Sequence, residues 1–124
     1  MTGLNKNVNW NAIWNTLPLI TEEAEKSEIK KMQNEGYKFM VGNQPMYDEC
    51  GFAIVKWKDK RSGLYRSYKK FLEINFDEDA DDIFSLYPSS SRQEKRVNVA
   101  VAKSVADYLN LSFGDCVYVK SWTD

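Results

Sequence analysis

The first 36 residues place apolar side chains at helical spacing, with one interruption. Trp10 and Trp14 are four residues apart, which puts both on one face of a short first helix. Pro18 is expected to end that helix, because proline has no amide hydrogen and its ring clashes with the preceding turn. Thr21 is a suitable N-cap for a second helix, with acidic residues after it where the helix dipole favours them. The pattern predicts a helical N-terminal region over residues 1–36.

Residues 37–76 follow the two-residue period of β-strands. Residues 37–41 are predicted to form one strand, and residues 52–58 and 64–76 to form two strands joined by a polar turn. The apolar end of this hairpin, residues 52–76, would join the core, whereas charged and aromatic residues gather toward its turn. We therefore expect a basic β-hairpin that projects from the molecule.

The last third of the chain, residues 96–122, combines a strand pattern with a helix pattern. Valines alternate over residues 97–101, and apolar residues at helical spacing then predict a short helix over residues 103–109. Gly114 and Asp115 predict a turn, since glycine reaches conformations that other residues avoid and aspartate can hold a turn with its side chain. A second strand is expected after it.

Together these elements predict a single α+β domain over residues 1–124. N-terminal helices would pack on a mostly antiparallel sheet from which the basic hairpin projects. A chain of 124 residues fits one domain. Its hydrophobic content of 43% and aromatic content of 14% are enough for a packed core.

The sequence contains no histidine, and this excludes whole classes of chemistry. Ser-His-Asp and Cys-His nucleophiles, an imidazole general base and His-rich metal sites all need that residue. Without it, Cys50 and Cys116 are too few for a four-ligand zinc site. We therefore expect no metal or other cofactor, and a protein that binds a partner rather than an enzyme.

Two features bear on the compartment. The asparagine-rich start lacks the apolar stretch of a signal peptide, and no run approaches the ~20 apolar residues of a membrane helix. Cys50 and Cys116 have no closely spaced partner, which is typical of free thiols in a reducing compartment. We expect a cytoplasmic protein with no membrane partner.

The net charge of −1 conceals a strong separation of charge along the chain. Residues 51–75 carry seven basic and two acidic side chains, a net charge of +5, whereas residues 76–95 carry six acidic and two basic ones, a net charge of −4. Such a chain can present one strongly positive face although it is nearly neutral as a whole. The acidic run over residues 77–82 lacks the glycine and closing glutamate of a calcium loop. It is expected to cap a helix, to balance the basic hairpin or to mimic a row of phosphates.

The basic hairpin is the candidate nucleic-acid-binding site. Its cations would contact phosphates, and its Trp57 and Tyr65 rings would stack on bases or buttress the cations. The residues assigned to the site are Lys56, Trp57, Lys58, Lys60, Arg61, Tyr65, Arg66, Lys69 and Lys70. A two-stranded ribbon also fits the DNA major groove. The same residues would suit an acidic protein surface, or a solvated hairpin with lysines extended over aromatic rings.

The main hypothesis is therefore a small regulatory protein that binds DNA or RNA, and two alternatives remain open. The first is a protein-binding inhibitor or adaptor of the kind that phages and mobile elements encode. Its interface anchors would be Trp10, Trp14, Trp57 and Trp122. The second is a metal-dependent nuclease with converging carboxylates. Those carboxylates would be Asp48, Glu49 and Glu73, near Lys56 or Lys58.

A run of apolar residues with a Gly-Asp turn extends without a gap through the last third of the chain. Its positions are Val101, Lys103, Val105, Leu109, Leu111, Gly114, Asp115, Val117 and Val119. This order, over residues 97–120, resembles the half-motif of the AbrB and MazE swapped-hairpin family and of the related double-psi barrels. Ala102 and Asn110 stand where that family usually has proline and glycine.

The resemblance implies a DNA-binding regulator that completes its fold as a homodimer. It also implies basic DNA contacts before the first strand. The residues available for them are Arg92, Lys95 and Arg96. The alternative is a generic unit of strand, helix, turn and strand.

Overall fold

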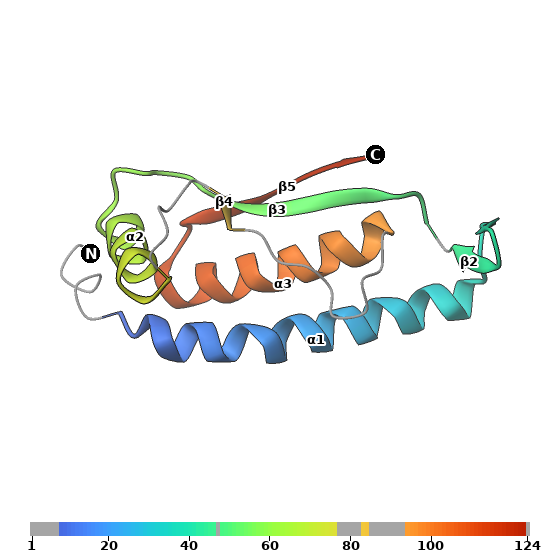
Figure 1. Ribbon diagram of the computed structural model, residues 1–124, viewed down its shortest axis with the longest axis horizontal. Coiled ribbons are helices and arrows are strands. Elements are labelled where there is room, and N and C mark those ends of the chain that lie inside the picture. The colour runs from blue at the N-terminus through green and yellow to red at the C-terminus, as the bar shows by residue number, and fades with distance from the viewer. Residues whose placement is uncertain (1–7, 47, 77–82, 85–93, 124) are drawn as a thin grey trace.

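The computed structural model describes residues 8–46, 48–76, 83–84 and 94–123 (Figure 1). Its elements in chain order are α1 (Trp10–Glu35), β1 (Phe39–Val41), β2 (Gln44–Met46), β3 (Gly51–Trp57), α2 (Gly63–Phe76), β4 (Ile83–Phe84), α3 (Lys95–Phe113) and β5 (Val117–Thr123). The predicted α+β class is confirmed, because these helices share a core with an antiparallel sheet.

The sheet, α3 and α1 form three successive layers (Figure 1). Strands β4, β3 and β5 lie side by side in that order, all antiparallel, and α3 packs along one face of them. Helix α1 packs on the other side of α3 and reaches the sheet near its N-terminal end, where Trp10 contacts Trp57. Helix α2 covers one end of the layers, and the small β1–β2 hairpin lies at the other.

One continuous helix, α1, takes the place of the two helices predicted for the N-terminal region. Pro18 lies inside it and does not end it. The helix is anchored on both sides of the proline. The Asn9 side chain accepts a hydrogen bond from the Ala12 amide at the N-cap (3.1 Å), and Leu17 and Met32 are buried. Tertiary packing therefore compensates for the backbone hydrogen bond that proline cannot donate.

The predicted projecting hairpin is wrong, because residues 64–76 form most of α2 rather than a strand. Five aromatic or aliphatic side chains of this segment are buried: Leu64, Tyr65, Tyr68, Phe71 and Leu72. A strand would divide them between two faces, whereas a helix buries them all on one side, so the helical period prevails. The Ser62 hydroxyl also accepts a hydrogen bond from the Tyr65 amide (3.1 Å) at the start of the helix.

The strand predicted over residues 97–101 is also wrong, since these residues belong to the first turns of α3. Val97, Val101 and Val105 are fully buried at intervals of four residues, which is the spacing of a helix stripe. The swapped-hairpin half-motif therefore lacks its first strand in this structure. Its helix, the turn at Gly114 (φ 86°) and the returning strand β5 are present.

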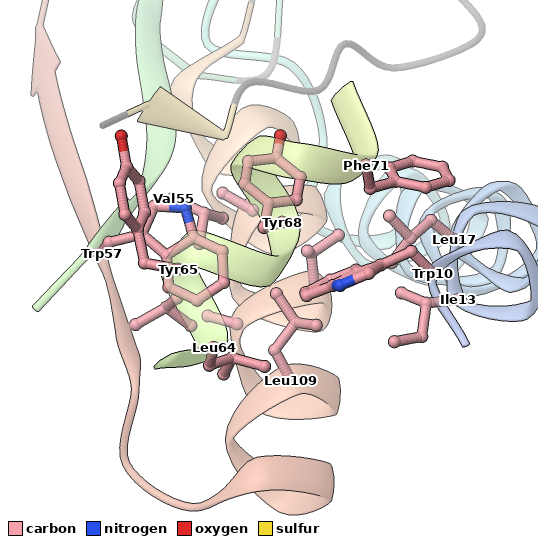
Figure 2. Close-up of a cluster of buried hydrophobic side chains, with 14 of the residues drawn as sticks. Trp10, Ile13, Leu17, Val55, Trp57, Leu64, Tyr65, Tyr68, Phe71 and Leu109 are labelled. Carbon is pink, nitrogen blue, oxygen red and sulfur yellow. The ribbon is translucent and has the colours of Figure 1, made fainter. Parts of the chain in front are cut away.

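Two groups of buried side chains hold the layers together. The larger contains an aromatic cluster contributed by α1, β3 and α2 (Figure 2). The smaller joins Met32 of α1 to Val97 and Val101 of α3. Among the described residues, no helix combines the length and the apolar character that crossing a bilayer requires.

Candidate nucleic-acid interface

The two aromatic residues assigned to the binding site lie in the core. Trp57 and Tyr65 are 4% and 8% exposed, and their rings meet edge to face with centroids 5.8 Å apart (Figure 2). Trp57 also contacts Tyr68, at 5.3 Å between ring centroids, and Trp10, at 6.4 Å. The prediction that these rings stack on bases is wrong, because a base would have to displace α1 and α2 from β3.

Helix α2 carries a concentration of exposed cations. Arg66, Lys69 and Lys70 occupy positions i, i+3 and i+4, so they project from one side of the helix, away from its buried residues. Lys60 and Arg61 are also exposed and lie in the loop just before the helix. We call these five residues the basic α2 surface.

Few acidic side chains accompany the basic α2 surface within the described part of the chain. Asp59 accepts a hydrogen bond from the Arg61 amide (2.9 Å) and lies 3.6 Å from the guanidinium Nε. Glu73 follows Lys70 on the same side of the helix. Residues 59–73 contain five basic and two acidic side chains, a net charge of +3. The acidic run over residues 77–82 lies outside the described residues.

Lys56 and Lys58 belong to other parts of the fold. Lys58 forms an ion pair with Asp115. Lys56 lies within β3 and points to the solvent side of the sheet, where Tyr118 of β5 is its cross-strand partner. The nine predicted residues are thus divided between the core, the basic α2 surface, strand β3 and the bend that follows it, and they do not form one ribbon.

The turn predicted at Gly114 and Asp115 is present, but a different side chain holds it. Asn110 Oδ1 accepts hydrogen bonds from the amides of Cys116 (2.9 Å) and Val117 (3.0 Å), and Asn110 Nδ2 donates to the Val117 carbonyl (3.1 Å). An asparagine can make all three bonds because its amide carries both donors and an acceptor. Asn110 is one of the two departures from the swapped-hairpin motif.

A hollow of about 260 Å³ opens beside this turn and is lined mainly by polar side chains, together with Cys116. Burial raises the pKa of the Cys116 thiol, so the sulfur is protonated at neutral pH. A protonated thiol is a weak nucleophile, and this hollow offers no activated sulfur.

The solvent side of the sheet presents a surface that the sequence reasoning did not assign. Inward residues of β3 and β5 such as Val55 and Val117 are buried, and the residues between them point outward. We define the outer sheet face by six outward residues: Phe52, Ile54, Lys56, Tyr118, Lys120 and Trp122. Its three aromatic side chains remain 41–42% exposed.

These six residues form three direct cross-strand pairs. Phe52 lies opposite Trp122, with ring centroids 5.9 Å apart. The other pairs are Ile54 with Lys120 and Lys56 with Tyr118. The alternation of inward and outward residues within β3 and β5 was the sequence signal for this face. The face was not predicted because residues 64–76, and not β5, were expected to pair with β3.

The carboxylates proposed for a metal site do not come together. Asp48 accepts a hydrogen bond from the Arg96 amide (3.0 Å) at the start of α3. Glu49 accepts one from the Thr123 hydroxyl (3.3 Å), whereas Glu73 lies on α2 at the other end of the layers (Figure 1). Within the ranges that the structure describes, no three Cys, Asp or Glu side chains are placed to hold a metal ion.

Two of the basic residues implied by the swapped-hairpin resemblance have partners inside the protein, and Arg92 lies outside the described residues. The Arg96 guanidinium donates to Glu28 (2.8 Å) and, through two nitrogens, to Glu35 (both 3.0 Å). This guanidinium lowers the pKa of Glu35. Lys95 donates to the Thr123 hydroxyl (3.2 Å). Arg96 therefore joins α3 to α1, and we assign it no contact with DNA.

Only one of the four tryptophans expected as protein-binding anchors is exposed. Trp10 and Trp57 are buried and Trp14 is half-buried, whereas Trp122 belongs to the outer sheet face. The adaptor alternative consequently loses most of the surface on which it was based.

Comparison with protein-family models, curated proteins and solved structures finds no match to the chain. The resemblance of residues 97–120 to the swapped-hairpin family thus stays a prediction.

Proposed function

We propose that this protein is a non-catalytic, regulatory nucleic-acid-binding protein whose basic α2 surface contacts phosphates. The observation that carries the proposal is the concentration of five exposed cations on one short helix and the loop before it. The N-terminal end of α2 adds partial positive charge next to Lys60 and Arg61. The surface is thus helical, where the sequence had suggested a ribbon.

A cationic helix face suits a nucleic-acid backbone for two reasons. Each phosphate that a lysine or arginine neutralises releases counterions, which favours binding at low salt. Three cations at positions i, i+3 and i+4 lie close enough together to contact neighbouring phosphates, and an α-helix fits the DNA major groove. The buried side of α2 packs the helix against the core through Tyr65, Tyr68 and Phe71, so the cations project from a helix that is anchored in the core.

The test compares binding of labelled duplex DNA, single-stranded DNA and RNA by fluorescence anisotropy at about 50 and 200 mM salt. Wild-type protein should bind at the lower salt and weaken steeply at the higher. The combined variant Arg66→Gln, Lys69→Gln and Lys70→Gln should bind at least about tenfold more weakly and show a shallower salt dependence, since it loses phosphate contacts.

The matched control replaces three exposed lysines outside this surface: Lys30→Gln, Lys31→Gln and Lys103→Gln. It changes the net charge by the same amount, so it should keep most of the affinity if the position of the charge matters. An absence of binding to all three nucleic acids at the lower salt would refute the proposal. Equal losses in the two triple variants would also refute it, because they would reduce the effect to overall charge.

A further inference from the structure

The outer sheet face has a composition that the fold does not require. Its inward neighbours pack against α3, but no described helix covers the outward residues. Phe52, Tyr118 and Trp122 are all substantially exposed, and they gather on one face instead of being scattered singly over the surface. Exposed aromatic residues gathered on a regular surface are typical of an interaction site.

The positive charge of this face indicates the kind of partner that it would bind. Lys56 and Lys120 are its ionisable cations, and none of its six residues is acidic. A partner that brings negative charge to flat rings is therefore favoured. A second copy of the chain, related by a two-fold axis, would present a face that likewise contains two lysines and no acidic residue.

The arrangement of rings and cations suits an unpaired strand. Tyr118 and Trp122 are four residues apart on β5, a separation of about 13 Å, and Lys120 lies between them on the same side. Unpaired bases can stack on such rings while the phosphates that join them approach the lysine. In a duplex the base faces are already stacked on one another, so the rings would find no base to contact.

We propose that the outer sheet face binds single-stranded nucleic acid, with bases stacked on Phe52, Tyr118 and Trp122 and phosphates held by Lys56 and Lys120. The proposal rests on the proposed function in taking nucleic acid as the partner. It places the binding of unpaired bases on a surface separate from the basic α2 surface.

The experiment measures the affinity of short oligo(dT), short oligo(U) and a duplex for wild-type protein and for Phe52→Ala, Tyr118→Ala and Trp122→Ala. Each loss of a ring should weaken single-strand binding by about tenfold, and duplex binding by less than about twofold. Trp122→Phe should recover most of the loss, because it keeps an aromatic face. Leu111→Ala and Ile74→Ala remove exposed apolar side chains elsewhere and should change neither affinity.

The change in intrinsic fluorescence at saturating oligonucleotide gives a second readout, which reports contact with a tryptophan and not affinity. Stacking of a base on Trp122 should quench wild-type emission, whereas emission from the buried Trp10 and Trp57 should respond little. Poly-glutamate serves as an anion without bases and should compete poorly for the face. Each variant is first shown to unfold at the wild-type temperature, which separates lost binding from lost structure.

The outcomes distinguish this proposal from the proposed function. If duplex binding depends on the α2 cations but no ring variant affects single-strand binding, only the present proposal is overturned. If no nucleic acid binds at low salt, both fail. Competition by poly-glutamate as strong as that by oligo(dT) would show that the face binds acidic polypeptides and would likewise overturn the stacking of bases.

Discussion

The Trp57 side chain is held by packing against other aromatic rings. Its ring contacts Trp10, Tyr65 and Tyr68, while its buried Nε1 atom has no hydrogen-bond partner among the residues that the structure describes. The indole is almost completely buried, so its contribution to stability comes from the burial of its apolar surface. At the scale of single residues, exposure thus separates these two tryptophans: Trp57 is 4% exposed and belongs to the core, whereas Trp122 is 42% exposed and belongs to the proposed binding face.

Replacing these two tryptophans should therefore have opposite effects. Trp57→Ala should lower the free energy of unfolding in urea by about 3–5 kcal/mol, because it leaves a cavity in the aromatic cluster. Trp57→Phe should cost less, since it keeps ring contacts and removes the unpaired N–H. Trp57→Phe should also leave nucleic-acid affinity at the wild-type value. A drop in affinity as large as that of Trp122→Ala would contradict the assignment of Trp57 to the core.

At the scale of elements, α2 is the helix on which the proposed function depends, and its helical state can be tested at an exposed position. Lys69 lies in the middle of the helix with its side chain in solvent. Lys69→Gly should be less stable than Lys69→Ala by about 1 kcal/mol, and Lys69→Val should lie between them. In a strand the order would change, because valine is favoured there over alanine and glycine. Urea denaturation of the three variants measures this order directly.

The elements that sequence could predict are those in which a single period is compatible with the residues. The helical region before Gly36 and the strand predicted over residues 52–58, which corresponds to β3, satisfy this condition. The turn at Gly114 was predictable for another reason, since it needs a glycine. Residues 64–76 are compatible with both the strand period and the helix period. Contacts with α1 and β3 favour the helix, and a local sequence pattern does not reveal these contacts. Likewise, Pro18 is tolerated because distant residues anchor both sides of it.

The two proposed binding surfaces, the basic α2 surface and the outer sheet face, were predictable to different extents. Charge can be read directly from the sequence, so Arg66, Lys69 and Lys70 were identified as part of a basic segment although the strand predicted for them was wrong. Which aromatic residues face solvent depends on strand pairing. The partner of Phe52 is Trp122, seventy positions away, and only that pairing reveals a shared face. The cations of the basic α2 surface followed from the sequence, whereas the exposed rings of the outer sheet face did not.

At the scale of the whole molecule, Arg96 connects segments that are far apart in the chain. It joins the start of α3 to Glu28 and Glu35 of α1, and its amide holds Asp48 before β3. The acidic groups stabilise the guanidinium and raise the pKa of Arg96, while the guanidinium lowers that of Glu35. The ionised Glu35 carboxylate therefore contributes to the contact between α1 and α3 at this end of the layers.

This contribution predicts how stability changes with pH. Because the pKa of Glu35 in the folded protein lies below its ordinary value of 4.5, the ionised carboxylate stabilises the fold above that value. The contribution is lost as the pH falls through the lowered pKa, where the folded carboxylate takes up a proton. The urea midpoint should therefore decrease on acidification below about pH 4.5.

Two variants test whether Glu35 causes this decrease. Glu35→Gln should show a lower urea midpoint at neutral pH and a shallower decrease on acidification. Glu23→Gln, a change at an exposed carboxylate of the same helix, should follow the wild-type curve. Identical acid profiles for Glu35→Gln and the wild type would mean that the bond between Arg96 and Glu35 does not stabilise the contact of α1 with α3.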